Sequence, residues 1–432
     1  MPQPQPQSQR VPVPALSASY PWRVLAAFSL LFFVVTAATF TSLGVVLPSM
    51  VTELHWSWTD AGLGFTLLGL ACGLSSFLPA MAIRRLGVRL TIVCGAVLLV
   101  TGFLCLFNAH GISAYFGGTT LVGIGYSFVA TVPGTYVLGR CFQRQSMAFG
   151  IYFSVGGLGG FVGPWVYFFA NAVWHTWRMH WMLAAVAIGA SALLTVLVLK
   201  EDEAERTTAA TIAATARKEA SPGIYHTVQA WSAQQALRTP QFYIIAAAYT
   251  SFLLVGITSN SFAVAHLSDN GYAPALAATM LSVQALVNAL ARIGGGLIGE
   301  VIEPRRLLMG SLFCIIVGLV ALSIGNSWLM LVLFAAGIGI GYGLTFVTTS
   351  VLLSNYFGRG PYLSLFAIIN LISTTACFGP VLGGAMKDKL GSFSSVFMLF
   401  ALVPLVVLVA ATFMRPPRRV EASGSAGAGA TI

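Results

Sequence analysis

The tetrapeptide Gly-Ile-Gly-Tyr occupies residues 123–126 and occurs again at residues 339–342. The two copies are 216 residues apart, which is half of the 432-residue chain. The same shift places the Gly-Pro pair of residues 163–164 on the Gly-Pro pair of residues 379–380. Two independent matches at one offset indicate that the chain consists of two copies of one ancestral unit.

The composition around these repeats is that of a membrane protein. Apolar residues make up 57% of the chain and charged residues only 8%, whereas soluble domains contain about 25% charged residues. At about 20 to 25 residues for each apolar span, the chain has room for roughly a dozen transmembrane helices. The formal net charge of +10 is explained by basic cytoplasmic loops and does not require a nucleic-acid partner.

Twelve apolar runs are expected to cross the membrane. Because six spans per copy is an even number, both copies enter the membrane in the same direction, as parallel repeats. The predicted fold class is an all-α membrane protein with twelve transmembrane helices in two parallel six-helix repeats. The predicted spans are residues 24–50, 59–83, 88–107, 113–139, 147–173, 179–199, 241–268, 274–301, 304–325, 328–356, 361–386 and 392–414.

The polar segments between and beyond the spans define the domain organisation. We expect six-helix bundles over residues 23–199 and 240–414, joined by a cytoplasmic linker over residues 200–239. Residues 1–22 and 415–432 are expected to be cytoplasmic tails, and the first of them is expected to be disordered. Eighteen Lys and Arg residues fall on the side of the termini and three on the other side. This asymmetry predicts that both termini are cytoplasmic.

Twelve spans, a six-plus-six repeat and a central linker resemble the major facilitator superfamily. The signature loop of that family, between the second and third spans, carries an acidic residue followed by basic residues. Here Arg84 stands at the acidic position and is followed by Arg85 and Arg89. The second copy of the loop keeps the acid as Glu300, followed by Arg305. The resemblance implies that Arg85 and Arg89 are gating residues in the first loop. It implies the same role for Glu300 and Arg305 in the second loop. The first loop lacks the usual acid.

Four shorter motifs resemble the monocarboxylate transporter and oxalate:formate antiporter branch of the superfamily. They lie within residues 44–57, 140–150, 288–296 and 379–391, and so extend along most of the chain. The resemblance implies a transporter of the plasma (inner) membrane. It also implies that Arg292, in the third of these motifs, binds the carboxylate of the substrate.

Arg292 is the one Lys or Arg residue placed deep inside a predicted span, since Arg89, Arg305 and Arg306 lie within the first three residues of theirs. It lies eight residues before Glu300 at the cytoplasmic end of that span, on the order of 12 Å into the membrane at 1.5 Å per residue. A guanidinium at this depth costs several kcal/mol unless it meets water or a partner. All twelve acidic residues are expected near a membrane face, so an anionic substrate is the favoured partner. The alternative is a structural arginine bonded to helix carbonyls or to Glu300.

Polar side chains in other spans are candidates to line the same substrate site. Gln284 and Asn288 precede Arg292 at intervals of four residues, which places the three on one face of a helix. Structural contacts between helices explain Gln284 and Asn288 equally well. For the candidate tyrosines, the equally good alternative is burial with a hydrogen bond to a backbone carbonyl. The further candidates are Tyr126, Tyr152, Tyr342 and Asn370.

The predicted function is secondary active transport of a small organic anion by alternating access, either as exchange or linked to protons. A single cationic anchor favours a monocarboxylate over a dicarboxylate. Two alternatives stay open: a transporter of another solute or drug with the same fold, and a membrane sensor that binds a carboxylate without moving it. We expect no enzyme activity, cofactor, metal site or nucleic-acid partner, and a monomer in the lipid bilayer.

One outer segment contains histidine and tryptophan side chains that could suggest a metal site. His175 and His180 lie beside Trp174, Trp177 and Trp181. Tryptophan concentrates at the boundary between lipid and water, so the sequence favours an aromatic belt at the outer surface.

Overall fold

The computed structural model describes residues 19–142, 145–200, 227, 231–299, 301–358 and 360–417. Every regular element in these ranges is a helix. Residues 1–18 and 418–432 of the predicted tails, most of the predicted linker and Glu300 lie outside the described residues. The prediction of a disordered tail up to residue 22 is wrong for its last three residues, because α1 begins at Tyr20. The helices are α1 Tyr20–Ala38, α2 Phe40–Leu54, α3 Trp58–Leu74, α4 Leu78–Leu86, α5 Val88–Phe107, α6 Ile112–Val129, α7 Thr131–Cys141, α8 Gln145–Trp174, α9 Arg178–Val198, α11 Ala233–Leu237, α12 Pro240–Asp269, α13 Pro274–Ile298, α14 Pro304–Ile324, α15 Trp328–Phe357, α16 Tyr362–Ser373, η1 Thr374–Phe378, α17 Gly379–Leu390 and α18 Ser394–Phe413.

These helices confirm the predicted fold class. In the part of the chain that the structure describes, eleven helical segments are long and apolar enough to cross a membrane. The number becomes twelve when α3 and α4, which meet at a bend of 49°, are taken together as one span. Because the apolar runs are so long, the helix ends fall close to the predicted limits of the spans.

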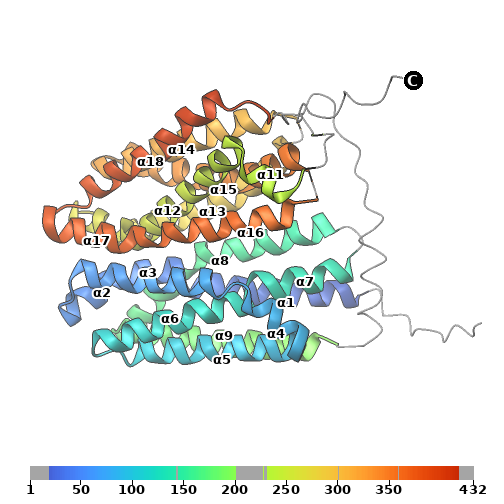
Figure 1. Cartoon of the computed structure of the whole chain (residues 1–432). Helices are drawn as coiled ribbons and strands as arrows, with labels where there is room; N and C mark the ends of the chain where they lie inside the picture. The colour runs from blue at the N-terminus through green and yellow to red at the C-terminus, as the bar shows by residue number, and fades with distance from the viewer. Residues whose placement is uncertain are drawn as a thin grey trace, which may run out of the picture. The chain divides into compact units, whose positions relative to one another are not determined.

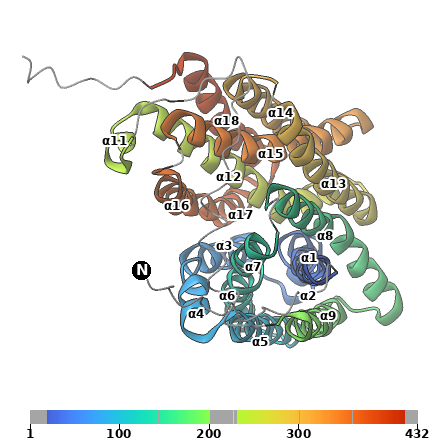
Figure 2. The ribbon, with the colours of Figure 1, turned by 90° about the vertical axis from the view of Figure 1, so that its right-hand side faces the viewer.

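Contacts divide the chain into two compact units. The first unit comprises residues 1–219 and 260–286, and the second comprises residues 220–259 and 287–432. The segment 260–286 groups with the first unit because α2 lies directly against it, so that a Cβ at Gly44 would overlap the carbonyl of Asn260. Within the first unit α5 packs against α6 and α9, and within the second α14 packs against α15 and α18 (Figures 1 and 2).

The sequence repeat is also a repeat of contacts. In the first unit Gly125 of α6 packs against α5, where an added Cβ would lie 2.9 Å from the carbonyl oxygen of Gly95. In the second unit Gly341 of α15 packs against α14, where an added Cβ would lie 2.7 Å from the carbonyl oxygen of Ser311. Both residues of the second contact follow those of the first by 216 positions. The two copies therefore pack their corresponding helices at the same point.

Within the described residues, four of the spans are broken, and three of the breaks precede a proline. Pro79 follows the bend between α3 and α4, Pro133 follows the break at Ala130 between α6 and α7, and Pro380 follows η1. Proline lacks an N–H and clashes with the carbonyl four residues earlier, so a helix commonly ends just before it. The fourth break, at Thr39 between α1 and α2, has no nearby proline; the Thr39 hydroxyl donates to the Val35 carbonyl at 2.9 Å.

The aromatic belt predicted for the outer segment is wrong for three of its residues. His180, Trp177 and Trp181 are buried, with at most 3% of their surface exposed. The Trp177 indole N–H donates to Glu53 at 2.5 Å, and Arg178 forms an ion pair with the same carboxylate. Trp177 and Arg178 thus join the start of α9 to the end of α2. The three buried side chains do not face lipid.

Candidate functional site

The candidate site is centred on Arg292 in α13. Its Nε donates a hydrogen bond of 3.1 Å to the side-chain oxygen of Asn288, one turn earlier on the same helix. The described residues provide no hydrogen-bond acceptor for its two terminal nitrogens and no carboxylate for an ion pair. Asn288 therefore fixes the direction of the guanidinium and leaves its terminal nitrogens available. Such a pair of nitrogens, called here the fork, is able to donate to both oxygens of a carboxylate.

Aromatic rings surround the guanidinium within the second unit. Its central carbon lies 4.7 Å from the centre of the Phe346 ring and 5.9 Å from that of Tyr342, both on α15. The Tyr342 ring meets Phe252 of α12 edge-on at 4.7 Å, and Phe252 meets Tyr249 at 4.8 Å. A ring face attracts a cation, so these contacts offset part of the cost of placing Arg292 inside the membrane.

Two glycines allow this arrangement. Gly343 lies where α15 touches α13, and an added Cβ would lie 2.6 Å from the Asn288 carbonyl oxygen and 3.1 Å from the Arg292 amide nitrogen. Gly256 of α12 lies directly under the Tyr342 ring, and an added Cβ would overlap that ring. Both close approaches require a residue without a side chain.

The remaining polar candidates of α13 and α16 lie in different surroundings. Gln284 is buried, and within the described residues its side-chain oxygen has no hydrogen-bond partner. Asn370 lies in the last turn of α16, directly before η1, and its side-chain nitrogen donates to the Phe366 carbonyl at 3.0 Å. The Phe366 ring in turn meets Tyr249 at 5.8 Å. Asn370 is therefore one helical turn from the aromatic rings of the second unit.

The two tyrosine candidates of the first unit contact the broken spans. Tyr126 is half-buried in α6 and meets Phe40, the first residue of α2, at 5.6 Å. Tyr152 of α8 is fully buried and stacks on Phe32 at 4.9 Å. Its hydroxyl donates to the carbonyl of Ala130, which lies at the break between α6 and α7. Both remain predictions as substrate-binding residues.

The candidate gating residues contact helix ends. Arg89, at the start of α5, donates to the carbonyl of Leu199 at the end of α9, with an Nε distance of 2.8 Å. Arg305, at the start of α14, donates to the carbonyl of Ala411 at 3.0 Å and to that of Thr412, both in the last turn of α18. Arg85 is exposed on α4. Cations stabilise helix C-termini, so the two bonded arginines hold each unit's helices together.

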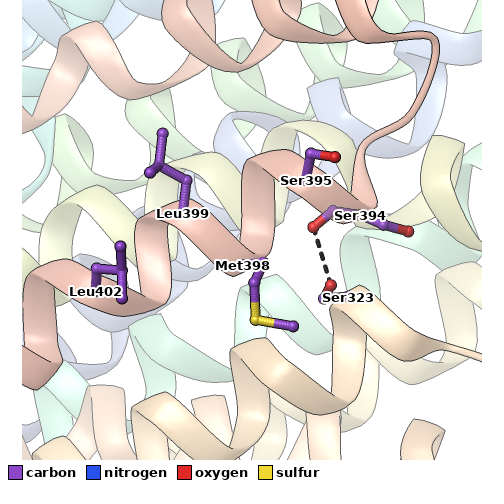
Figure 3. A pocket seen from close by; sticks show the side chains of 6 residues that line it. All are labelled: Ser323, Ser394, Ser395, Met398, Leu399 and Leu402. Atoms are coloured by element: carbon purple, nitrogen blue, oxygen red, sulfur yellow. Dashed lines mark hydrogen bonds between the residues drawn. The ribbon is translucent and has the colours of Figure 1, made fainter.

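One surface hollow lies elsewhere, between α14 and α18 (Figure 3). The Ser323 hydroxyl donates to the Ser394 carbonyl at 2.9 Å across its floor. None of its lining side chains is charged, so this hollow does not suit an anion. Its lining residues are Ser323, Ser394, Ser395, Met398, Leu399 and Leu402.

The sequence did not reveal the aromatic part of the site. Tyr249, Phe252 and Phe346 come from two different helices, and an isolated aromatic residue in an apolar span is usually packing or facing lipid. One signal was present, because Phe346 follows Tyr342 by four residues and so shares its face of α15.

The fold is that of an integral membrane protein built from transmembrane helices. The sequence matches the family model of the Major Facilitator Superfamily over residues 28–268 and 252–431. The chain belongs to the Major Facilitator Superfamily.

Curated relatives and solved structures agree with this assignment. The chain is 26% identical to monocarboxylate transporter 13 of Rattus norvegicus over 326 residues, which are 73% of this chain and 70% of that protein. It is 26% identical to monocarboxylate transporter 13 of Bos taurus over 327 residues, with coverage of 73% and 71%.

Among solved structures, a mutant form of the nucleoside transporter NupG matches with a TM-score of 0.70 and 14% identity, covering 91% of this chain and 99% of that one. A bacterial homologue of the human lysosomal transporter Spinster matches with a TM-score of 0.63 and 18% identity, covering 92% and 96%. At these identities the structures support the fold alone.

Proposed function

We propose that this transporter carries a small organic anion with one carboxylate, and that Arg292 binds that carboxylate. The observation that supports the proposal most strongly is the guanidinium itself: its Nε is held by Asn288, and its terminal nitrogens have no acceptor among the described residues. The names of the two curated relatives agree with a monocarboxylate.

The charge of Arg292 supplies a reason for transport to depend on substrate. When a carboxylate occupies the fork, the two opposite charges cancel, and the loaded protein changes conformation without moving a net charge through apolar surroundings. The empty protein retains an unpaired guanidinium, which disfavours the same change. Alternating access in this proposal is therefore faster with the anion bound than without it.

Substitution of Arg292 tests the proposal. Arg292→Lys keeps the charge but loses the planar fork, so we expect a large fall in affinity for short monocarboxylates and a loss of uptake into proteoliposomes. Arg292→Ala is expected to abolish both. Arg306→Ala is the matched control, because Arg306 is exposed and its ion-pair partner among the described residues is Glu303, at 3.4 Å. Uptake by Arg292→Ala near the parent rate would place the anion site elsewhere.

Uptake also distinguishes the transporter from a sensor, since a sensor would bind carboxylates without accumulating them in vesicles. We further propose that the protein works as a monomer in the plasma membrane with both termini in the cytoplasm. The excess of Lys and Arg on the side of the termini supports this orientation.

A further inference from the structure

The rings near Arg292 form one continuous aromatic surface within the second unit. Its members, called here the aromatic wall, come from α12, α15 and α16. Neighbouring ring centres lie between 4.7 and 6.4 Å apart, which is the range in which aromatic rings attract one another. The aromatic wall consists of Tyr249, Phe252, Tyr342, Phe346 and Phe366.

The aromatic wall has a buried layer and an accessible layer. Tyr249 is 6% exposed and Phe252 is 1% exposed, so these two rings form the buried layer against which the other three rings pack. Tyr342, Phe346 and Phe366 are half-buried, as is Arg292. The two accessible rings nearest the guanidinium are those of Phe346 and Tyr342, and Phe366 extends the aromatic wall through its contact with Tyr249.

This combination of groups selects for a particular shape of anion. In the proposed function the fork of Arg292 binds a carboxylate. Among the described residues, no second cation lies over a ring of the aromatic wall. Acetate would fill the fork and leave the accessible rings uncovered. A flat ring joined to the carboxylate would cover them, and it would gain edge-to-face or offset contacts that a saturated ring of the same size makes less well.

We infer, on the basis of the proposed function, that the anion carried is an aromatic monocarboxylate. Its carboxylate binds Arg292, and its ring packs against Tyr342, Phe346 and Phe366. Phe346 has the central place in this arrangement, because it lies beside the guanidinium and also within 6.4 Å of both rings of the buried layer.

The test is a binding titration of the purified full-length protein with four small probes. Phenylacetate and cyclohexylacetate carry the same charge and differ in the flatness of the ring; acetate lacks the ring, and phenylacetamide lacks the charge. We expect phenylacetate to bind about 2- to 10-fold more tightly than cyclohexylacetate, acetate to bind more weakly than both, and phenylacetamide not to bind.

Two variants make the test specific. Phe346→Leu and, separately, Phe366→Leu are expected to reduce the preference for phenylacetate over cyclohexylacetate to about 1-fold while both acids still bind. Phe169→Leu is the control, since Phe169 is a 60% exposed ring of α8 outside the aromatic wall. Far-ultraviolet circular dichroism and elution volume verify that each variant is folded.

The outcomes separate this inference from the proposed function. Equal binding of cyclohexylacetate and phenylacetate to the parent protein, or tighter binding of acetate, would overturn the aromatic inference and leave the carboxylate site in place. Unchanged preference in both Phe variants would overturn it as well. Failure of every carboxylate to bind, or binding that persists undiminished in Arg292→Ala, would overturn the proposed function and this inference together.

Discussion

A single hydrogen bond orients the guanidinium of Arg292. Nε is the only guanidinium nitrogen with an acceptor among the described residues, and that acceptor is the Asn288 side chain at 3.1 Å. Asn288 acts as a positioning residue because it orients the fork without titrating.

Asn288→Asp is expected to make anion binding depend on pH. An ionised Asp at this position would pair with Arg292 and compete with the substrate for the guanidinium. Protonation of that Asp would release the guanidinium, so affinity for a monocarboxylate should rise as the pH falls. Titration calorimetry over a series of pH values measures this slope.

Asn288→Ala serves as the control for that experiment. It loses the same hydrogen bond but introduces no titrating group, so it should bind the anion more weakly by an amount that does not change with pH beyond that of the parent. A flat pH profile for Asn288→Asp would show that residue 288 and Arg292 are not coupled.

At the scale of helices, the site depends on how closely α15 approaches α13. The two helices meet at Gly343, whose added Cβ would lie 2.6 Å from the Asn288 carbonyl oxygen. The corresponding contact in the first unit involves Ser127, 216 positions earlier, whose hydroxyl lies 2.8 Å from that of Ser75. At this level the first copy joins its two helices by a hydrogen bond between hydroxyls, whereas the second copy packs a glycine against the backbone of α13 beside Arg292.

Gly343→Ala is expected to separate α15 from α13 and to destabilise the protein by about 1–3 kcal/mol, the usual cost of overpacking. The shift should also weaken anion binding, because it moves the backbone of Arg292. Gly294→Ala on α13 is the matched control, since nothing lies within 4 Å of an added Cβ there. Thermal unfolding with and without ligand measures both effects, and equal behaviour of the two variants would contradict the close contact.

Arg89 bonds to the end of α9 and Arg305 bonds to the end of α18, and these hydrogen bonds are called here the arginine clasps. They are expected to stabilise their units independently. Arg89→Ala and Arg305→Ala should each lower stability by up to about 2 kcal/mol through loss of a cation at a helix C-terminus. Because the two clasps lie in separate units, the double variant should show the sum of the single effects. Arg85→Ala, at an exposed position, is the control. A double variant whose loss of stability differs strongly from the sum of the single losses would contradict independent clasps.

The sequence predicted the helices better than their interruptions. Long apolar runs mark the spans because length and composition alone decide membrane insertion. Pro133 and Pro380 were visible as signals of a break, yet Pro164 lies inside the continuous helix α8 although it is the repeat partner of Pro380. Arg292 was identifiable from its charge, whereas Gly256 and Phe252 belong to the site only through contacts across helices that no local pattern encodes.

For the whole molecule, the distribution of charge predicts its orientation in the membrane. A reporter fused after Ile432 and a tag inserted near Ala214 should both be cytoplasmic, because eighteen basic residues lie on that side and three on the other. Accessibility to an impermeant label in intact cells measures this. Either site outside the cell would contradict the twelve-span topology.

The charge of Arg292, which has no carboxylate partner among the described residues, also predicts how transport is coupled. Under the proposed function the loaded protein is neutral at Arg292 and the empty one is not, so exchange of anions across the membrane should be faster than net flux of one anion. Asn288 offers no proton-binding group beside the arginine. Radiolabelled exchange and net uptake in the same vesicles give the two rates; accumulation driven by a pH gradient, without any anion inside, would show the prediction wrong.

The clasps of Arg89 and Arg305 also bear on how the chain is made and where it came from. Each joins the third and the last helix of one copy, so each closes a set of six helices using only residues of that copy. The first clasp can form once Leu199 has left the ribosome, before the second copy exists. An ancestor with a single copy would have possessed the same hydrogen bond between its third and last helices, and duplication would then have doubled it.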